Sequence, residues 1–278
     1  MLADHLARKG IAVLRVDDRG VGKSTGNLDG TTADFANDVE AGVDFLKTQA
    51  RIDGGRIGLM GHSEGGTIAP FVASRRSDVS FIVLLAGTGL PGAELLVLQS
   101  ELLNRSAGKS AEEIARATSI NRRIYTIVQG DGDEATMSKQ VRTILLESMG
   151  PESGPQKLDQ AGLEALVKVQ TDAMLSPWMR HFLSYDPRPA LARVSCPILG
   201  LFGQKDMQVP AKPNMAAIRK ALHASLNKDI TLQELHHLNN MFQTCQIGSP
   251  AEYAAIQETI APSALDLITA WIRRRVGK

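Results

Sequence analysis

The stretch that most constrains the fold covers residues 56–68, with the sequence RIGLMGHSEGGTI. It reads as a short buried strand that reaches Ser63 without a spacer and continues into the start of a helix. Gly61 and Gly65 flank the serine with the spacing G-x-S-x-G. A serine at the tip of so tight a turn needs neighbours without bulky side chains, and we expect both glycines to provide that space.

Ser63 is therefore the candidate nucleophile. A sharp strand-to-helix turn exposes the serine hydroxyl, and it aims the backbone N–H of Glu64 and the helix N-terminus at the place where an oxyanion would form. The alternative is an inert turn, since Gly-Ser turns between strands and helices are common. The flanking strand and helix favour the catalytic interpretation.

The composition fits a globular protein that acts on small molecules. The 278 residues are 43% hydrophobic and 22% charged, which is enough for one core plus an insertion. Lys and Arg number 31 against 30 Asp and Glu, so the charge balance gives no reason to expect a nucleic acid or an anionic membrane as partner.

Other sequence signals suggest an ordinary cytoplasmic chain. The N-terminus lacks a basic region followed by an apolar run, and no uninterrupted apolar stretch has membrane-spanning length, so we expect a cytoplasmic location. The two cysteines, Cys196 and Cys245, lack metal-binding spacing and are too few for a disulfide framework. We interpret both as packing residues.

Helices and strands alternate in the first third of the chain. The pattern predicts a helix at 2–9, a strand at 11–16, a helix at 32–49 and, after the Ser63 turn, a continuous apolar strand at 80–87. Apolar strands of this kind are typical of parallel sheets covered on both faces. We therefore predict an α/β fold with a doubly wound, mostly parallel sheet.

A phosphate-binding loop is suggested by Gly22, Lys23 and Ser24, but two features exclude it. Asp17 stands where the pattern G-x-x-x-x-G-K-[ST] requires its first glycine, and the helix that should begin at Lys23 starts several residues later. Arg19 in the same loop is expected to tie the loop down rather than to act chemically.

The alternation stops between residues 91 and 189. Four helical segments are predicted there, at 93–104, 110–128, 134–149 and 158–175. Ser110 and Glu113 have capping-box spacing, and residues 150–155 separate the last two segments. We predict a core formed by residues 1–90 and 190–278, with residues 91–189 as a helical cap.

Two features of the insertion have alternative interpretations. The sequence GDGDE at residues 130–134 could suggest calcium, but the EF-hand pattern needs a further ligand and a glycine where Ala135 and Thr136 stand, so a loop and a helix N-terminus are predicted instead. His181 either lines a pocket or is a packed structural histidine.

The last third returns to strands. A strand at 196–203 is followed, three residues later, by Asp206, which is well placed to orient a catalytic imidazole. The alternative is an exposed turn aspartate. Another strand is predicted at 230–235, a helix start at Ser249 with Pro250 and Glu252, and a final amphipathic helix ending near Arg275.

These features together resemble bacterial α/β-hydrolases, in particular the esterase and serine-aminopeptidase-like group with an Asp-Asp-Arg-Gly-Val-Gly-Lys-Ser loop, here residues 17–24. The resemblance covers essentially the whole chain. It implies Ser63 as nucleophile, Asp206 as the acid of the triad and a cap formed by the insertion. It also implies a small-molecule ester or acyl substrate and no need for a metal or an organic cofactor.

The chain departs from this family first at its N-terminus. In the family, a strand before the opening helix lies between the counterpart of the strand at 11–16 and the elbow strand, and its following loop gives the second oxyanion N–H. Loss of one oxyanion donor costs about 100-fold to 1000-fold in rate. We therefore expect either that the strand at 11–16 closes against the elbow strand or that a partner chain, such as a second copy, fills the gap.

The second departure concerns the general base. The family loop reads Asn-His-Leu-Phe, and Asn240 occupies the histidine position here. Asparagine cannot take a proton from serine at neutral pH. His236 and His237 lie four and three residues earlier, and one of them, with His237 preferred, would reach Ser63 if the loop shifts. The alternative is that both are ordinary loop histidines.

Two functional hypotheses follow. The first is a serine hydrolase that cleaves a carboxylic ester or related acyl bond through an acyl-enzyme on Ser63, with Glu64 N–H as oxyanion donor. The second is a catalytically impaired or non-catalytic protein that keeps the fold.

Overall fold

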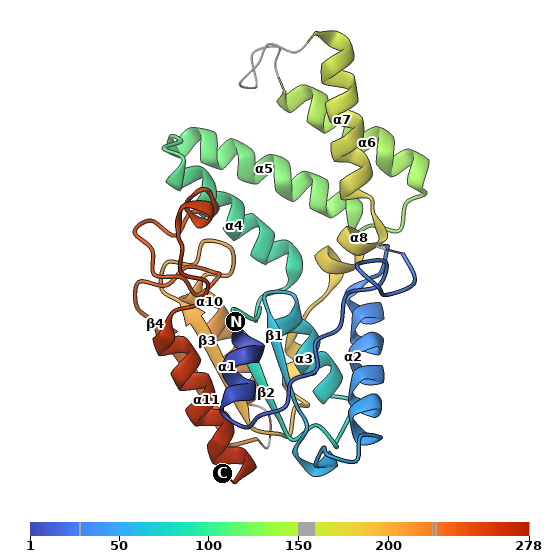
Figure 1. Ribbon diagram of the computed structural model, residues 1–278. Helices are drawn as coiled ribbons and strands as arrows, with labels where there is room; N and C mark the ends of the chain where they lie inside the picture. Colours follow the sequence, from blue (N-terminus) through green and yellow to red (C-terminus); the bar gives the residue numbers. More distant parts are fainter. Residues whose placement is uncertain (28, 150–158, 224, 226, 278) are drawn as a thin grey trace. The chain divides into compact units, whose positions relative to one another are not determined.

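The computed structural model describes residues 1–27, 29–149, 159–223, 225 and 227–277 (Figure 1). It contains two compact units. The sheet unit comprises Met1–Leu28, Thr32–Pro91 and Asp186–Lys278, and the helical unit comprises Asp29–Thr31 and Gly92–Tyr185.

The sheet unit is built on four parallel strands. They are β1 (Gly58–His62), β2 (Phe81–Leu85), β3 (Ile198–Gly203) and β4 (Ile230–Leu235), in the order β1-β2-β3-β4. All five residues of β2 are buried, as the continuous apolar pattern predicts for an inner parallel strand. The predicted α/β fold with a parallel sheet is thus confirmed.

The helices of the sheet unit follow the predicted alternation. They are α1 (Leu2–Arg8), α2 (Thr32–Lys47), α3 (Gly65–Ala73), α9 (Arg188–Leu191), α10 (Ala211–His223) and α11 (Pro262–Val276), with short 3-10 turns at Gly54–Arg56 and Pro250–Ala255. α2 begins well after Ser24, as expected if residues 17–24 form an ordinary loop. Arg19 ties that loop to α2 through two 2.8 Å hydrogen bonds to the carboxylate of Asp38.

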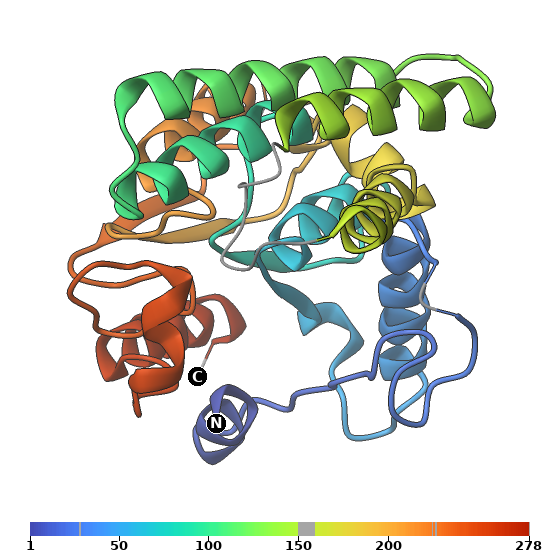
Figure 2. The same cartoon turned by 90° about the horizontal axis from the view of Figure 1, so that it is seen from above.

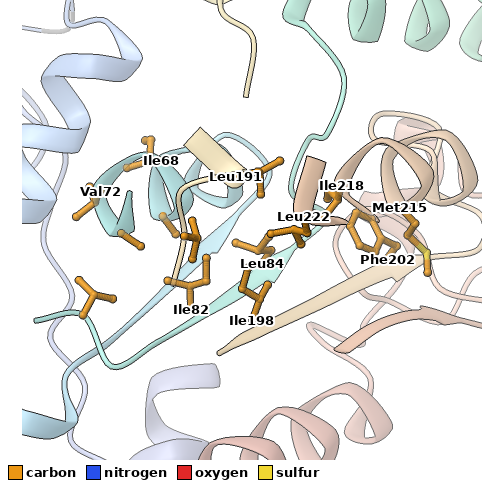
Figure 3. Packing of buried hydrophobic residues seen from close by; sticks show 14 of the residues in the cluster. Ile68, Val72, Ile82, Leu84, Leu191, Ile198, Phe202, Met215, Ile218 and Leu222 are labelled. Atoms are coloured by element: carbon orange, nitrogen blue, oxygen red, sulfur yellow. The ribbon is translucent and has the colours of Figure 1, made fainter. Parts of the chain in front are cut away.

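The main core lies on the face of the sheet that α3 and α10 cover (Figure 3). Side chains alternate between the two faces of a strand, so Ile82 and Leu84 of β2 point into this core. Phe81 points to the other face, where its ring meets Trp271 of α11 edge-on at 5.9 Å between centroids. Both faces of the sheet are therefore covered by helices.

The strand predicted at residues 11–16 is wrong. This segment has no strand structure, and Val13, Leu14 and Val16 are exposed. A strand needs a neighbour to receive its backbone hydrogen bonds, and β1 pairs only with β2 in the described part of the chain. Seen from above, residues 11–16 pass on the open side of β1 (Figure 2).

The helix start predicted at Ser249 is a short 3-10 turn instead. Ser249 does cap it, by accepting a hydrogen bond from the Ala251 N–H. Glu252, however, accepts hydrogen bonds from the backbone N–H groups of residues 246–248, so its carboxylate organises the preceding loop rather than completing a capping box. The long helix of this region is α11, whose residues Leu265, Ile268 and Ile272 are buried as predicted.

The helical unit contains α4 (Gly92–Ser106), α5 (Ala111–Val128), α6 (Glu134–Ser148), α7 (Gln160–Met174) and α8 (Pro177–Ser184). Ser110 and Glu113 form the predicted capping box of α5. Asp133 caps α6 by accepting from the Thr136 N–H at 2.9 Å, so the acidic loop is a helix start, as expected. The predicted break at 150–155 lies outside the described residues.

α8 is a separate helix that was not predicted. Its signals were Ser176 as N-cap and Pro177 at the first position, and Ser176 Oγ accepts from the Met179 N–H at 3.2 Å. His181 lies on this helix and stacks on Tyr185, with 5.8 Å between ring centroids. Within the described ranges, none of the helices combines the length and the apolar character needed to cross a bilayer.

Candidate active site

Ser63 lies in the tight turn between β1 and α3. Its φ of +53° is a left-handed conformation that non-glycine residues rarely adopt. The turn is held by its backbone: the Ser63 N–H donates to the Leu85 carbonyl at 2.8 Å, and the Ser63 carbonyl accepts from the Gly66 N–H at 2.9 Å. The Ser63 hydroxyl forms no hydrogen bond within the described residues, and Ser63 as a residue is partly exposed.

The glycines around Ser63 have different roles. A Cβ at Gly61 would overlap the carbonyl of Gly65, so Gly61 is required for space, as predicted. A Cβ at Gly66 would lie 2.6 Å from the Cα of Gly87 at the end of β2. At Gly65, by contrast, there is open space, so the expectation that Gly65 relieves crowding is wrong. The close approach of α3 to the strands depends on Gly61 and Gly66.

Glu64 forms the N-cap of α3. Its carbonyl accepts hydrogen bonds from the N–H groups of Thr67 and Ile68 at 2.8 and 2.9 Å. Its carboxylate accepts a 2.7 Å hydrogen bond from the hydroxyl of Thr32, which is buried at the start of α2. The Glu64 backbone N–H thus belongs to the first turn of a helix, where the partial positive charge of the helix dipole lies.

Asp206 follows β3 and is only 4% exposed, so the exposed-turn alternative for it is wrong. Its Oδ1 accepts from the backbone N–H groups of Gln208 and Val209, both at 2.8 Å. Its Oδ2 accepts from Nδ2 of Asn240 at 2.8 Å. Burial raises the pKa of Asp206 to about 6, although these three hydrogen bonds favour the charged form.

Asn240 occupies the position next to the acid and is 2% exposed. While its side chain binds Asp206, its backbone carbonyl accepts a 2.8 Å hydrogen bond from Nε2 of His62. Asn240 therefore connects the loop after β3 with the end of β1, one residue before Ser63.

The turn that carries Asn240 is internally bonded. Asn239 and Gln243 exchange two 3.0 Å hydrogen bonds, from Asn239 Nδ2 to Gln243 Oε1 and from the Gln243 N–H to Asn239 Oδ1. Asn239 is fully buried, and Phe242 has φ +60°. These contacts fix the backbone on both sides of Asn240.

The two predicted bases lie outside this cluster of hydrogen bonds. His236 and His237 are exposed, with 6.4 Å between their ring centroids. The His237 N–H donates to Gln204 Oε1 at 3.2 Å, and its φ is +62°. Neither imidazole donates to Asp206, whose partners within the described residues are Gln208, Val209 and Asn240. The structure thus brings Asp206 to Asn240 rather than to a histidine.

His62 is a residue of the site that sequence reasoning missed. Besides its bond to Asn240, its ring meets Phe242 edge-on, with 6.3 Å between centroids. Its position beside Ser63 in the G-H-S-E-G motif was a signal that could have identified it. The described residues contain no group of His, Cys, Asp and Glu side chains arranged to hold a metal ion.

Comparison with known families gives a match to a hydrolase family. Residues 1–148 match the family described as serine aminopeptidase, S33. This stretch includes α1, the Ser63 turn and most of the helical unit. A comparison with curated protein sequences gives no match.

Solved structures with similar folds include several hydrolases. The α/β-hydrolase GrgF from Penicillium sp. sh18 matches with a TM-score of 0.59 and 15% identity, over 100% of this chain and 84% of its own. The Pyrococcus furiosus esterase PF2001 gives 0.54 and 16%, over 98% and 72%. Est1E from Butyrivibrio proteoclasticus with bound ferulic acid gives 0.50 and 16%, over 100% and 82%. At these identities the similarity establishes the fold.

Proposed function

Because the chain belongs to the serine aminopeptidase S33 family of α/β-hydrolases, we propose that it is a serine hydrolase that cleaves a carboxylic ester or related acyl bond. The observation that carries the proposal is the conformation of Ser63, which has φ +53° between β1 and the first turn of α3. This conformation is typical of a nucleophile elbow. The role of a cap for the helical unit is part of the same proposal.

In this mechanism the Ser63 hydroxyl attacks the substrate carbonyl carbon and loses its proton to a general base. The oxyanion that forms is stabilised by the Glu64 N–H and the N-terminus of α3. Collapse of the tetrahedral intermediate releases the alcohol, which takes the proton from the base, and leaves an acyl group on Ser63. Water then attacks the acyl-enzyme by the same steps and regenerates the serine.

The proposed base is His237, with His236 as the alternative. Both imidazoles are exposed, and a change in loop conformation is needed before either is oriented by Asp206. Asn240 cannot take this role, because its side-chain amide does not accept a proton near pH 7.

A specific observation favours the second candidate function, a catalytically impaired or non-catalytic hydrolase-fold protein. The carboxylate of Asp206 already binds Asn240, and the turn at 239–243 is held by buried hydrogen bonds that a loop shift has to break. Removal of a triad histidine costs about 10⁴-fold to 10⁶-fold in rate, and the residual catalysis comes from the oxyanion site and binding.

Reaction with a fluorophosphonate probe discriminates between the two candidates. For an active serine hydrolase we expect rapid stoichiometric labelling of the folded chain, with the added mass located on Ser63 and absent from Ser63→Ala. A folded chain that is not labelled, or is labelled equally in Ser63→Ala, contradicts the serine-hydrolase proposal and supports the impaired candidate.

A further inference from the structure

A carboxylate stands next to the candidate nucleophile. Glu64 follows Ser63 in the chain, and its backbone N–H is the proposed oxyanion donor. The carboxylate oxygens of a glutamate lie within about 6 Å of the nitrogen of the same residue, because only a few bonds separate them. An oxyanion bound to that N–H lies about 3 Å from the nitrogen. Two negative charges would therefore come close together during the reaction, and like charges repel.

The Glu64 carboxylate is bound at the start of α2. Its Oε1 accepts a 2.7 Å hydrogen bond from the hydroxyl of Thr32. Thr32 is the first residue of α2 and is only 1% exposed. The first turn of a helix carries a partial positive charge, which favours a carboxylate at that place. The side chain of Glu64 is thus bound at the N-terminus of α2, while its backbone N–H belongs to the N-terminus of α3.

Packing between two helices fixes the position of Thr32. α2 and α3 lie side by side in the sheet unit (Figures 1 and 2). Ala36 of α2 belongs to the same buried cluster as Ile68 and Val72 of α3. Thr32 lies four residues before Ala36 and therefore on the same face of the helix. Its hydroxyl is held beside α3 by the core and not only by the hydrogen bond to Glu64.

We propose that Thr32 is a positioning residue for the oxyanion site of the hydrolase. Its hydroxyl holds the Glu64 carboxylate at the N-terminus of α2 and so keeps the negative charge away from the oxyanion. Without this hydrogen bond the glutamate side chain is free to adopt rotamers that bring its charge towards its own backbone N–H. This role rests on the proposed function, because the oxyanion arises only when Ser63 attacks a substrate.

The size of the effect follows from Coulomb's law. At an effective dielectric constant of about 20, a like charge that moves from about 9 Å to about 5 Å from the oxyanion slows its formation by about 10-fold. The distance between the two charges cannot exceed the reach of one glutamate side chain, so the hydroxyl of Thr32 can moderate this repulsion but not abolish it.

The test is a double-mutant cycle, read by the rate at which a fluorophosphonate probe labels Ser63. Thr32→Val removes the hydroxyl and keeps the shape of the side chain. We expect it to lower the maximal labelling rate by about 10-fold. The probe concentration at half-maximal rate should change little, because the negative charge develops only in the transition state. In the Glu64→Gln background we expect Thr32→Val to change the rate by less than about 2-fold, because no charge is then released.

Two further variants control the experiment. Thr32→Ser restores a hydroxyl and should recover most of the rate that Thr32→Val loses. Thr67→Val makes the same change at a buried threonine of α3, whose hydroxyl has no hydrogen-bond partner among the described residues, and it should not slow the labelling. Circular dichroism establishes that each chain is folded, and Thr32→Ala replaces Thr32→Val if the valine variant does not fold.

Two results overturn the proposal and leave the proposed function intact. Equal slowing by Thr32→Val with and without Glu64→Gln would give the hydroxyl a structural role that is independent of the charge. Unchanged labelling of Thr32→Val would show that the carboxylate does not need the hydroxyl. A folded parent chain that is not labelled on Ser63 is a different result, because it contradicts the proposed function and this role together.

Discussion

The side-chain amide of Asn240 donates a 2.8 Å hydrogen bond to Oδ2 of Asp206, whose Oδ1 is already bonded to two backbone N–H groups. All three donors to the buried acid are amide N–H groups, which do not exchange protons with a substrate at neutral pH. In the proposed hydrolase Asp206 is the acid of the triad, and this hydrogen bond places the Asn240 amide at the position where the family has its catalytic imidazole.

We expect Asn240→His to increase esterase activity. The acid that would orient the imidazole is in place, and an imidazole at this position can take the Ser63 proton. General-base catalysis contributes about 10²-fold to 10⁴-fold, so we expect kcat/KM for a p-nitrophenyl ester to rise by about 10²-fold or more.

Two variants control this experiment. Asn240→Gln keeps an amide and should leave the rate unchanged, and Ser63→Ala in the Asn240→His background should remove the gain. If the folded Asn240→His chain hydrolyses esters no faster than the parent, Asp206 and position 240 do not work as a catalytic pair with Ser63.

The hypothesis that a loop histidine acts as the base makes a separate prediction. His237→Gln should lower the rate of fluorophosphonate labelling by about 10²-fold or more, because the proton acceptor is lost. His236→Gln is the matched neighbour and should have a much smaller effect if His237 is the base. Equal labelling rates in the parent and in both variants would show that neither imidazole serves Ser63.

The elements that the sequence predicted well have local signals. In the helical unit α5 and α6 begin at the side-chain caps Ser110 and Asp133, and in the sheet unit β2 is a continuous apolar run. Residues 11–16 carry an equally strong strand pattern but form no strand. Strand formation depends on a neighbour that is distant in the sequence, and the pattern of six residues does not reveal whether that neighbour exists.

The site was predictable to a similar extent. Asp206 could be placed because it lies three residues after a buried strand, and the amide at position 240 was visible in the sequence. The contact between His62 and the Asn240 carbonyl joins residues 178 positions apart, so no local pattern indicates it. The internal bonding of the 239–243 turn, which opposes the loop shift assumed for His237, was also invisible before the fold was known.

The raised pKa of Asp206 predicts a pH-dependent cost in stability. Its folded-state pKa of about 6 lies above the ordinary value of 3.8. Below pH 3.8 both states hold the proton. Between pH 3.8 and about 6 the folded state binds this proton more tightly than the unfolded state does. The free energy of unfolding therefore falls as pH rises through this range, and the stabilisation from the proton is fully lost above about pH 6. The loss amounts to about 3 kcal/mol for a shift of this size.

We therefore expect Asp206→Asn to increase the free energy of unfolding at pH 7, by about 1–3 kcal/mol, and to change it much less at pH 4. Denaturant unfolding of both chains at the two pH values measures this difference. Asp229→Asn, at a half-exposed carboxylate in the same unit, is the control. A variant that is less stable than the parent by the same amount at both pH values contradicts the prediction.

The two glycines of the G-x-S-x-G motif should respond differently to the same substitution. Gly61→Ala forces a methyl group against the Gly65 carbonyl, and overpacking of this kind costs about 1–3 kcal/mol. Gly65 begins α3 and has open space around it, so Gly65→Ala should raise stability by about 0.5–1 kcal/mol through helix propensity.

Thermal unfolding of both variants, followed by fluorophosphonate labelling at a temperature where both are folded, measures the two effects. We expect labelling to fall in Gly61→Ala and to persist in Gly65→Ala, because only the first change displaces the turn that holds Ser63. A Gly61→Ala chain as stable as the parent would mean that movement of α3 relieves the crowding at Gly61, and a loss of stability in Gly65→Ala would contradict the open space at that position.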